Sequence, residues 1–237
     1  MKIRRTQTAL RCLDLLVVVL AAPIWVPTLL VVGASVVISS GTPTLFCQAR
    51  VGRDDRLFSM RKFRSMRDGV NPLIPDPDCI TPIGRFLRRT SLDELPQLLN
   101  VLDGSMSLVG PRPLLPSQQA ALSELQKFRH SVRPGLTGLA QVSGRNTLSW
   151  DERFVFDLEW ASAPSIRGYF AILGRTVRTV LSGSGVEGHD AADRVIATAN
   201  SAVLDLDTIS LPLDPPLEIG SNHVHSERPF AGSTERS

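Results

Sequence analysis

Residues 15–38 read LLVVVLAAPIWVPTLLVVGASVVI, and none of these 24 positions carries a charge. A helix of about 20 apolar residues is long enough to cross the ~30 Å hydrocarbon core of a bilayer. The stretch is longer than the apolar part of a typical signal peptide, and no convincing cleavage site follows it. A membrane-inserted segment therefore decides the architecture, and a plain transmembrane anchor is its simplest interpretation.

Two features of the sequence oppose a straight crossing. Pro23 and Pro27 lie inside the stretch, and each removes a backbone donor and disturbs the preceding helical turn. Basic residues flank both ends, so the positive-inside rule places both flanks in the cytoplasm. A helix that enters, bends at proline and returns satisfies both features, with Thr28 or Ser35 as partners for the freed carbonyls. The residues alone leave the re-entrant and spanning arrangements open. The flanking basic residues are Lys2, Arg4, Arg5 and Arg11, then Arg50, Arg53, Arg56, Arg61 and Lys62.

The rest of the chain has the composition of one globular domain with a tail. Its 237 residues carry a net charge of +3 and are 43% hydrophobic, which excludes a disordered chain, a collagen and a multi-span membrane protein. Three scattered cysteines exclude a disulfide scaffold. Residues 50–150 are basic and residues 186–237 acidic. We expect a membrane segment over 1–40, a body with a cation-rich surface over 41–199 and an acidic, disordered tail over 200–237.

Cations recur at two places in this basic body. Lys62 and Arg64 alternate with apolar residues after a predicted hairpin. This pattern is consistent with two cations that point at one anion, and equally with an edge strand whose cations face solvent. Residues 82–89 read as a helix with proline in its first turn. Three arginines share one face of that helix, where an anion would relieve their repulsion. An ordinary exposed basic face, or contact with lipid headgroups, explains them equally. These arginines are Arg85, Arg88 and Arg89.

Adjacent carboxylates follow in Ser91-Leu92-Asp93-Glu94, which matches the capping-box pattern. Pro96 is tolerated only in the first helical turn, so we expect the helix to begin near Asp93 or Glu94. Both carboxylates would then lie at the positive end of a helix, where one stays ionised and can act as a nucleophile. Neighbouring carboxylates do not face each other on a helix, which argues against a glycosidase pair.

Two turns rich in proline and glycine complete the pattern. In Pro111-Arg112-Pro113 an arginine is held between two prolines, and its planar fork suits a phosphate or a base edge. Arg133-Pro134-Gly135-Leu136-Thr137-Gly138 is a similar turn, whose glycines could bring backbone N–H groups close to an anion. Gln141 and Arg145 lie in a polar loop beyond it. Each of these signals has an alternative explanation in turn geometry alone.

Taken together, these strings resemble the monotopic polyprenyl-phosphate phosphoglycosyl transferases, which are bacterial sugar transferases. The resemblance runs from about Arg5 to about Arg194. The chain is similar to the smallest members of the family, which have one hydrophobic segment. It implies an α/β, mostly helical fold, in which an N-terminal re-entrant helix hairpin lies on a small catalytic body at the cytoplasmic face of the inner membrane. By spacing, Pro27 matches the proline of the family's bend, and Pro23 is extra. Features similar to the enzyme that initiates bacterial protein glycosylation are Ser149-Trp150, Glu152 and Gly188-His189.

The resemblance also implies a reaction and roles for the motifs. The family moves a sugar 1-phosphate from a UDP-sugar to undecaprenyl phosphate, requires Mg²⁺ and releases UMP. Asp93 corresponds to the family's nucleophile and forms a covalent intermediate, and Glu94 is its acidic neighbour, so these two are the expected metal ligands. The expected partners are the UDP-sugar, undecaprenyl phosphate and membrane phospholipid, with no nucleic acid. We expect phosphate contacts from Lys62, Arg64, Arg85 and Arg88, and nucleotide contacts from Arg112, Arg145 and Gln141.

A membrane-anchored basic binding module is the alternative function. Only the net charge favours it, and one tyrosine and three tryptophans are too few for an aromatic platform that stacks nucleic-acid bases. It predicts no role for Asp93. The two hypotheses therefore differ in what replacing Asp93 does to transfer.

Overall fold

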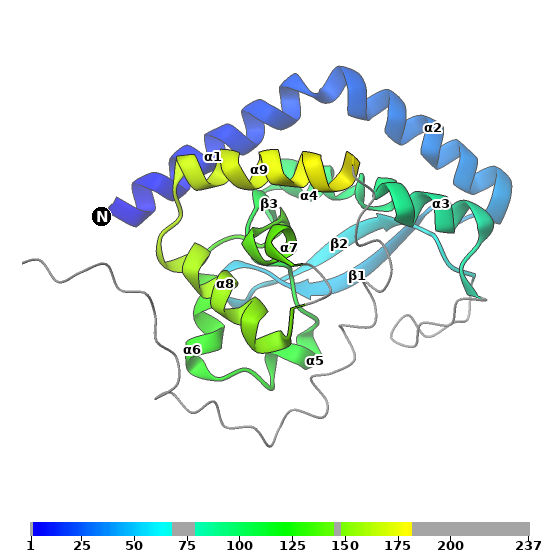
Figure 1. Cartoon of the computed structure of the whole chain (residues 1–237). Coiled ribbons are helices and arrows are strands. Elements are labelled where there is room, and N and C mark those ends of the chain that lie inside the picture. Colours follow the sequence, from blue (N-terminus) through cyan, green and yellow to red (C-terminus); the bar gives the residue numbers. More distant parts are fainter. Residues whose placement is uncertain (1, 68–78, 145–147, 182–237) are drawn as a thin grey trace, which may run out of the picture. The chain divides into compact units, whose positions relative to one another are not determined.

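The computed structural model describes residues 2–67, 79–144 and 148–181. Within these ranges the chain is mostly helical, as predicted, and it contains two small sheets (Figure 1). The predicted tail over 200–237 and Arg145 lie outside the described residues.

The helices are α1 (Lys2–Leu20), α2 (Ala22–Ser40), α3 (Pro82–Thr90), α4 (Gln97–Asp103), α5 (Pro116–Gln119), α6 (Glu124–Lys127), α7 (Leu139–Ser143), α8 (Trp150–Ser162) and α9 (Ile166–Leu181). Short 3₁₀ turns are η1 (Arg53–Asp55), η3 (Leu92–Glu94) and η4 (Phe128–Ser131). The strands are β1 (Leu45–Val51), β2 (Leu57–Phe63), β3 (Ser107–Val109) and β4 (Gly135–Thr137).

The two sheets have two strands each. β1 and β2 form the predicted antiparallel hairpin, with Leu45 opposite Phe63 and Val51 opposite Leu57. β3 and β4 are parallel, which brings the two turns rich in proline and glycine together although about 25 residues separate them. The second sheet therefore assembles motifs that the sequence shows only as separate strings.

The apolar stretch folds as two helices that meet at a bend. The helix is interrupted at Ala21, and Pro23 lies in the first turn of α2 (Figure 1). Pro27 lies inside α2, so the interruption falls at the proline that the family spacing identified as extra. The buried indole of Trp25 donates a hydrogen bond of 2.9 Å to the carbonyl of Val18, which ties the start of α2 back to the end of α1.

The hydroxyl partners expected for the freed carbonyls bond elsewhere. Thr28 donates to the carbonyl of Ile24 at 2.8 Å, and Ser35 donates to that of Val31 at 2.9 Å. The carbonyls that Pro23 and Pro27 release are four residues before each proline, and neither hydroxyl reaches them. This part of the prediction is wrong, because each hydroxyl serves its own preceding turn.

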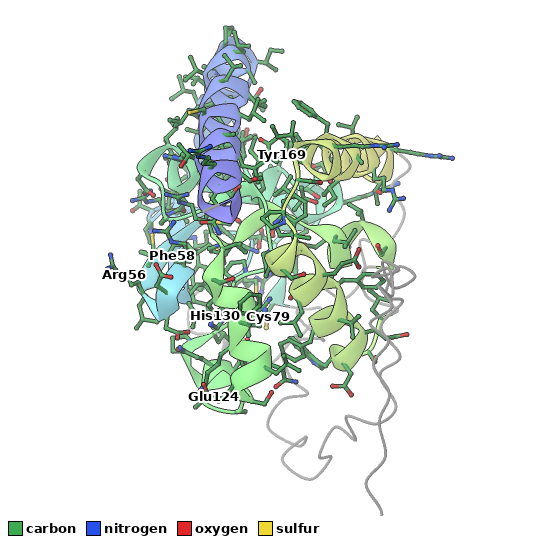
Figure 2. The ribbon with its side chains drawn as sticks, turned by 90° about the vertical axis from the view of Figure 1, so that its left-hand side faces the viewer. Arg56, Phe58, Cys79, Glu124, His130 and Tyr169 are labelled. Carbon is green, nitrogen blue, oxygen red and sulfur yellow. The ribbon has the colours of Figure 1, made fainter. Side chains whose placement is uncertain are left out.

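α1 is fixed to the body by a buried carboxylate. Asp14 is only 1% exposed and accepts hydrogen bonds from the Ser107 hydroxyl (2.8 Å), the Leu108 backbone N–H (3.0 Å) and the Tyr169 hydroxyl (3.0 Å). Figure 2 shows Tyr169 on α9, on the side of that helix nearest α1. A buried carboxylate needs such donors, so Asp14 joins α1 to β3 and α9.

α2 differs from α1 in what it exposes. Its large apolar side chains face outward along much of its length, and Ile38 is 86% exposed. Among the described residues, α2 is the one helix that is long and apolar enough to cross a membrane. Its inner side packs through Val32 and Val36 on Phe63 and Leu87 of the body. The fold is thus compatible with a monotopic membrane protein.

Candidate active site

Asp93 and Glu94 lie in η3, between α3 and α4. The capping-box prediction is wrong: Ser91 has a φ of 58° and ends α3, and its side chain makes no capping bond. A helix that began there would need an N–H at Pro96, which proline lacks. The backbone instead closes 3₁₀ bonds, Glu94 N–H to Ser91 and Leu95 N–H to Leu92, and α4 begins after Pro96. The two carboxylates therefore precede α4 and do not form its first turn.

Glu94 is held by two cations from different parts of the chain. Its Oε1 lies 2.8 Å from Lys62 Nζ and 3.5 Å from Arg112 Nη2. Lys62 comes from β2 and Arg112 from the Pro111-Arg112-Pro113 turn, so this carboxylate joins two of the predicted anion-binding strings. The side chains of Lys62 and Glu94 are 17% and 16% exposed. A partly desolvated ion pair is stronger than one at the surface.

Asp93 is buried, with only 9% of its surface exposed. Burial, followed by the charge of Glu94, raises the pKa of Asp93 to about 6, against the opposing charges of Lys62, Arg88 and Arg112. A carboxylate with this pKa is mostly ionised at neutral pH. The structure thus surrounds a desolvated carboxylate with cations, and such an environment suits an attacking group that meets phosphate.

Asp93 and Glu94, with Lys62, Arg88 and Arg112, form the carboxylate–cation cluster of the candidate site. Arg88 belongs to it because α3 lies close to the end of β2. Thr81 caps α3 by accepting from the Gly84 N–H at 3.0 Å. A Cβ at Gly84 would lie 2.0 Å from the carbonyl oxygen of Ser65, so only glycine permits this approach. The Ser65 hydroxyl then accepts from Arg88 Nε at 2.9 Å. Sequence reasoning assigned no role to Ser65 or Gly84, although a threonine directly before Pro82 is typical of a helix cap.

Arg64 and Arg85 do not join the cluster. The buried Arg64 guanidinium donates to the carbonyls of Ser40, Gly41 (2.8 Å) and Thr42 (3.4 Å), at the C-terminal end of α2. The prediction that Lys62 and Arg64 point at one anion is wrong for Arg64, because β2 ends at Phe63 and a cation suits the negative end of a helix. Arg85 is exposed on α3, one turn before Arg88.

Interlocked backbones hold the turn that presents Arg112. The Gly110 N–H donates to the Thr137 carbonyl at 2.8 Å, and the Gly135 N–H donates to the Pro111 carbonyl at 2.9 Å. A Cβ at Gly135 would lie 2.1 Å from the backbone nitrogen of Gly110. These two N–H groups therefore join one turn to the other and do not face an anion, which corrects the expectation for Gly135.

The structure places Gln141 beside this interlock. Gln141 lies on α7, and a Cβ at Gly138 would lie 2.5 Å from its side-chain oxygen. Both polar atoms of the Gln141 amide are buried and have no hydrogen-bond partner among the described residues. An unpaired buried amide is unusual. Gln141 therefore stays a candidate ligand contact.

The donor set can be compared with the needs of a magnesium ion. Among the described residues there is no group of three or more His, Cys, Asp or Glu side chains that could hold a metal. Mg²⁺ is usually held by one or two carboxylates together with substrate phosphates and water. The Asp93–Glu94 pair is therefore sufficient for Mg²⁺ that arrives with a diphosphate, and insufficient for a closed metal cage.

Comparison with known proteins identifies the family. The model of the family described as bacterial sugar transferase matches residues 5–183. The chain is 45% identical to the uncharacterized sugar transferase EpsL of Bacillus subtilis, over 65% of this chain and 79% of that protein. It is 39% identical to the undecaprenyl-phosphate galactose phosphotransferase of Salmonella typhimurium, over 61% of this chain and 35% of that protein. It is 43% identical to the UDP-glucose:undecaprenyl-phosphate glucose-1-phosphate transferase of Escherichia coli, over 56% of this chain and 32% of that protein.

The matches differ in how much of each relative they cover. The chain spans most of the B. subtilis protein but about a third of the S. typhimurium and E. coli proteins. The family model covers most of this chain, including both carboxylates and every cation of the cluster. The chain therefore belongs to the bacterial sugar transferase family.

Proposed function

We propose that this chain transfers a sugar 1-phosphate from a UDP-sugar to undecaprenyl phosphate and releases UMP. One observation carries the proposal: Asp93 is a buried carboxylate beside Glu94, and Lys62, Arg88 and Arg112 surround it. The reaction brings a diphosphate and a lipid phosphate to one place, and their negative charge must be neutralised before phosphorus can be attacked. The names of the S. typhimurium and E. coli relatives support the same chemistry.

The proposed reaction has two displacements at one phosphorus. In the first, a carboxylate oxygen of Asp93 attacks the sugar-bearing phosphorus of the UDP-sugar, and the bond to the bridging oxygen breaks. UMP leaves with that electron pair, and the sugar phosphate becomes bonded to the Asp93 carboxylate as an acyl phosphate. In the second, a phosphate oxygen of undecaprenyl phosphate attacks the same phosphorus, and Asp93 leaves as a carboxylate. Atoms and charge balance without an external base, since both attacking groups are already anions.

The cations have separate tasks in this scheme. Arg88, oriented by Ser65, binds a non-bridging oxygen of the transferred phosphate. Before substrate binds, Glu94 keeps Lys62 and Arg112 ordered by pairing with both. When the UDP-sugar binds, these two cations give up part of that interaction and contact its diphosphate. Mg²⁺, held by Asp93, Glu94 and the diphosphate, would neutralise charge on the leaving UMP.

We further propose that α1 and α2 form a re-entrant hairpin at the cytoplasmic face of the inner membrane. Basic residues on both flanks, the interruption at Ala21 and the hydrogen bond from Trp25 support a bend with both ends on one side. The outward apolar side chains of α2 suit a lipid environment. This arrangement would bring the body to the membrane surface, where the phosphate of a lipid carrier lies.

UMP release tests the proposal directly. Detergent-solubilised protein is given undecaprenyl phosphate, Mg²⁺ and UDP-glucose, UDP-galactose or an N-acetylated UDP-sugar in turn. We expect UMP with at least one donor, and no UMP from the Asp93→Asn protein, which keeps the shape of the side chain but lacks the anionic nucleophile. If the Asp93→Asn protein releases UMP at the wild-type rate, the assigned mechanism is wrong. If the wild type releases none while binding liposomes, the binding module replaces the enzyme as the better account.

A further inference from the structure

A second arginine and carboxylate pair lies behind Arg112, deep in the body. Arg129 of η4 and Asp157 of α8 are 2% and 5% exposed. Arg129 Nη2 and Nε donate to Asp157 Oδ2 at 2.6 and 3.1 Å. The guanidinium also lies over the Phe154 ring, 5.6 Å from its centroid. This pair is too buried to meet a substrate, and the proposed reaction does not use it.

The same guanidinium also supports the backbone of Arg112. Arg129 Nη2 donates to the Arg112 carbonyl at 2.7 Å. The two flanking carbonyls have partners as well: Pro111 accepts from the Gly135 N–H at 2.9 Å, and Pro113 accepts from Arg50 Nη1 at 3.2 Å. Proline on both sides of Arg112 removes two backbone donors from this turn. At two of the three carbonyls, those of Arg112 and Pro113, the donor is therefore the side chain of a buried arginine and not a backbone N–H of a neighbouring strand.

A stabilising role alone does not explain such a pair. Removing two charges from water costs several kcal/mol per ion, and apolar residues of similar size often replace buried pairs without loss of stability. What an apolar pair could not do is donate a hydrogen bond to the Arg112 carbonyl. That bond fixes the backbone from which the Arg112 side chain reaches Glu94. The arrangement therefore specifies geometry at the site.

We infer that Arg129, with its charge balanced by Asp157, is a positioning residue that sets where Arg112 meets Glu94 and the donor diphosphate. The inference rests on the proposed function, since it assigns Arg112 to the UDP-sugar. It predicts a larger effect on the KM for the UDP-sugar than on the KM for undecaprenyl phosphate. It also predicts that the effect passes through Arg112 alone.

The test replaces the pair by apolar residues, Arg129→Met with Asp157→Leu, and measures UMP release and the thermal unfolding midpoint together. We expect kcat/KM for the UDP-sugar to fall by about 10- to 100-fold, with the midpoint close to that of the wild type. In an Arg112→Ala background the same pair of substitutions is expected to change kcat/KM less than threefold, as coupled positions do. The matched control is Glu124→Gln, which breaks the exposed Lys127–Glu124 pair and should leave both readouts unchanged.

Arg129→Lys covers the case in which the apolar pair does not fold. Lysine keeps the charge balance with Asp157 but lacks the planar fork that serves two acceptors at once, so kcat/KM should again fall. Wild-type kcat/KM in whichever variants fold, or a full additional loss in the Arg112→Ala background, would overturn the inference.

If the wild type itself shows no UMP release, the proposed function fails instead. UDP binding measured by calorimetry then decides the inference: weaker binding by Arg129→Lys supports it and unchanged binding refutes it.

Discussion

Helix α2 and the turn from Gly110 to Pro113 are held in opposite ways. α2 turns large apolar side chains outward, and only its inner side packs on the body. The turn is mostly buried, and backbone or arginine donors occupy each carbonyl from Pro111 to Pro113. The position of α2 thus depends on the solvent around it, whereas the position of Arg112 depends on bonds inside the protein. Substitutions in the two regions should consequently change different observables.

Among substitutions that test this comparison, the largest effect is expected from replacing Glu94, the carboxylate that pairs with Arg112 of the turn. Glu94→Gln removes the charge that orders Lys62 and Arg112, and we expect UMP release to fall by about 100- to 1,000-fold. The measurement is the steady-state rate at saturating substrates. The control is Asp103→Asn, which breaks the exposed Arg61–Asp103 pair and should cost at most about 1 kcal/mol of stability with little change in rate. A Glu94→Gln rate equal to that of this control would contradict the assignment.

The backbone interlock should be the next most sensitive feature. Gly135→Ala places a Cβ 2.1 Å from the backbone nitrogen of Gly110. We expect a loss of about 3 kcal/mol in the free energy of unfolding and about 100-fold in rate, because the turn must move. Gly174→Ala on α9 is the control: a Cβ there meets nothing within 4 Å, and alanine should raise helix stability slightly. Equal melting temperatures for the two variants would rule out a tight interlock.

A change in α2 should alter membrane topology with little effect on the body. In a cysteine-free background carrying Thr6→Cys, an impermeant maleimide added from the periplasmic side should not label the parent protein. Pro23→Ala with Pro27→Ala should let part of the population span the membrane and become labelled, because the prolines no longer interrupt the helix. Pro27→Ala alone should stay unlabelled, since the interruption lies at Ala21. Labelling of the parent protein would show a spanning helix.

The smallest effect concerns His130, the one histidine among the described residues. Figure 2 shows it within the body, and its Nδ1 lies 2.6 Å from Asp55 Oδ1 in η1. Burial, followed by the charge of Arg129, lowers the pKa of His130 below 6.5, although Asp55 opposes the shift. A lowered pKa means that the unfolded chain takes up this proton first as the pH falls. Stability from neutral His130 is therefore present above pH 6.5 and lost below it.

Denaturant unfolding at a series of pH values checks this sign. Between pH 7 and pH 5 the wild type should lose unfolding free energy faster than His130→Gln, which has no proton to take up at this position. Taking the difference between the two proteins removes contributions from the other titrating groups. Parallel curves, or a steeper loss in the variant, would show that Asp55 stabilises the charged imidazole more than burial disfavours it.

The sequence predicted those parts of the site that local patterns encode. Lys62, Glu94 and Arg112 come from strings that are ambiguous one by one and specific in combination, and the structure brings the three side chains together. Strand alternation placed Arg64 beside Lys62, but β2 ends before Arg64. The capping-box pattern made Ser91 the start of a helix, but Pro96 prevents a helix from beginning there. Arg129 and Asp157 meet across 28 residues, and no spacing rule relates them. Tertiary packing alone reveals such positions.

A covalent sugar phosphate on Asp93 distinguishes the two-displacement mechanism from direct transfer, and mass spectrometry of the digested protein can detect it. The protein is incubated with Mg²⁺ and its UDP-sugar in the absence of undecaprenyl phosphate, quenched and digested. If Asp93 is the nucleophile, a peptide that contains Asp93 will be heavier by one sugar phosphate, will form with one equivalent of UMP and will be absent from Asp93→Asn. UMP that appears only when the lipid phosphate is added, with no mass change on the protein, would show direct transfer between the two substrates without an intermediate on Asp93.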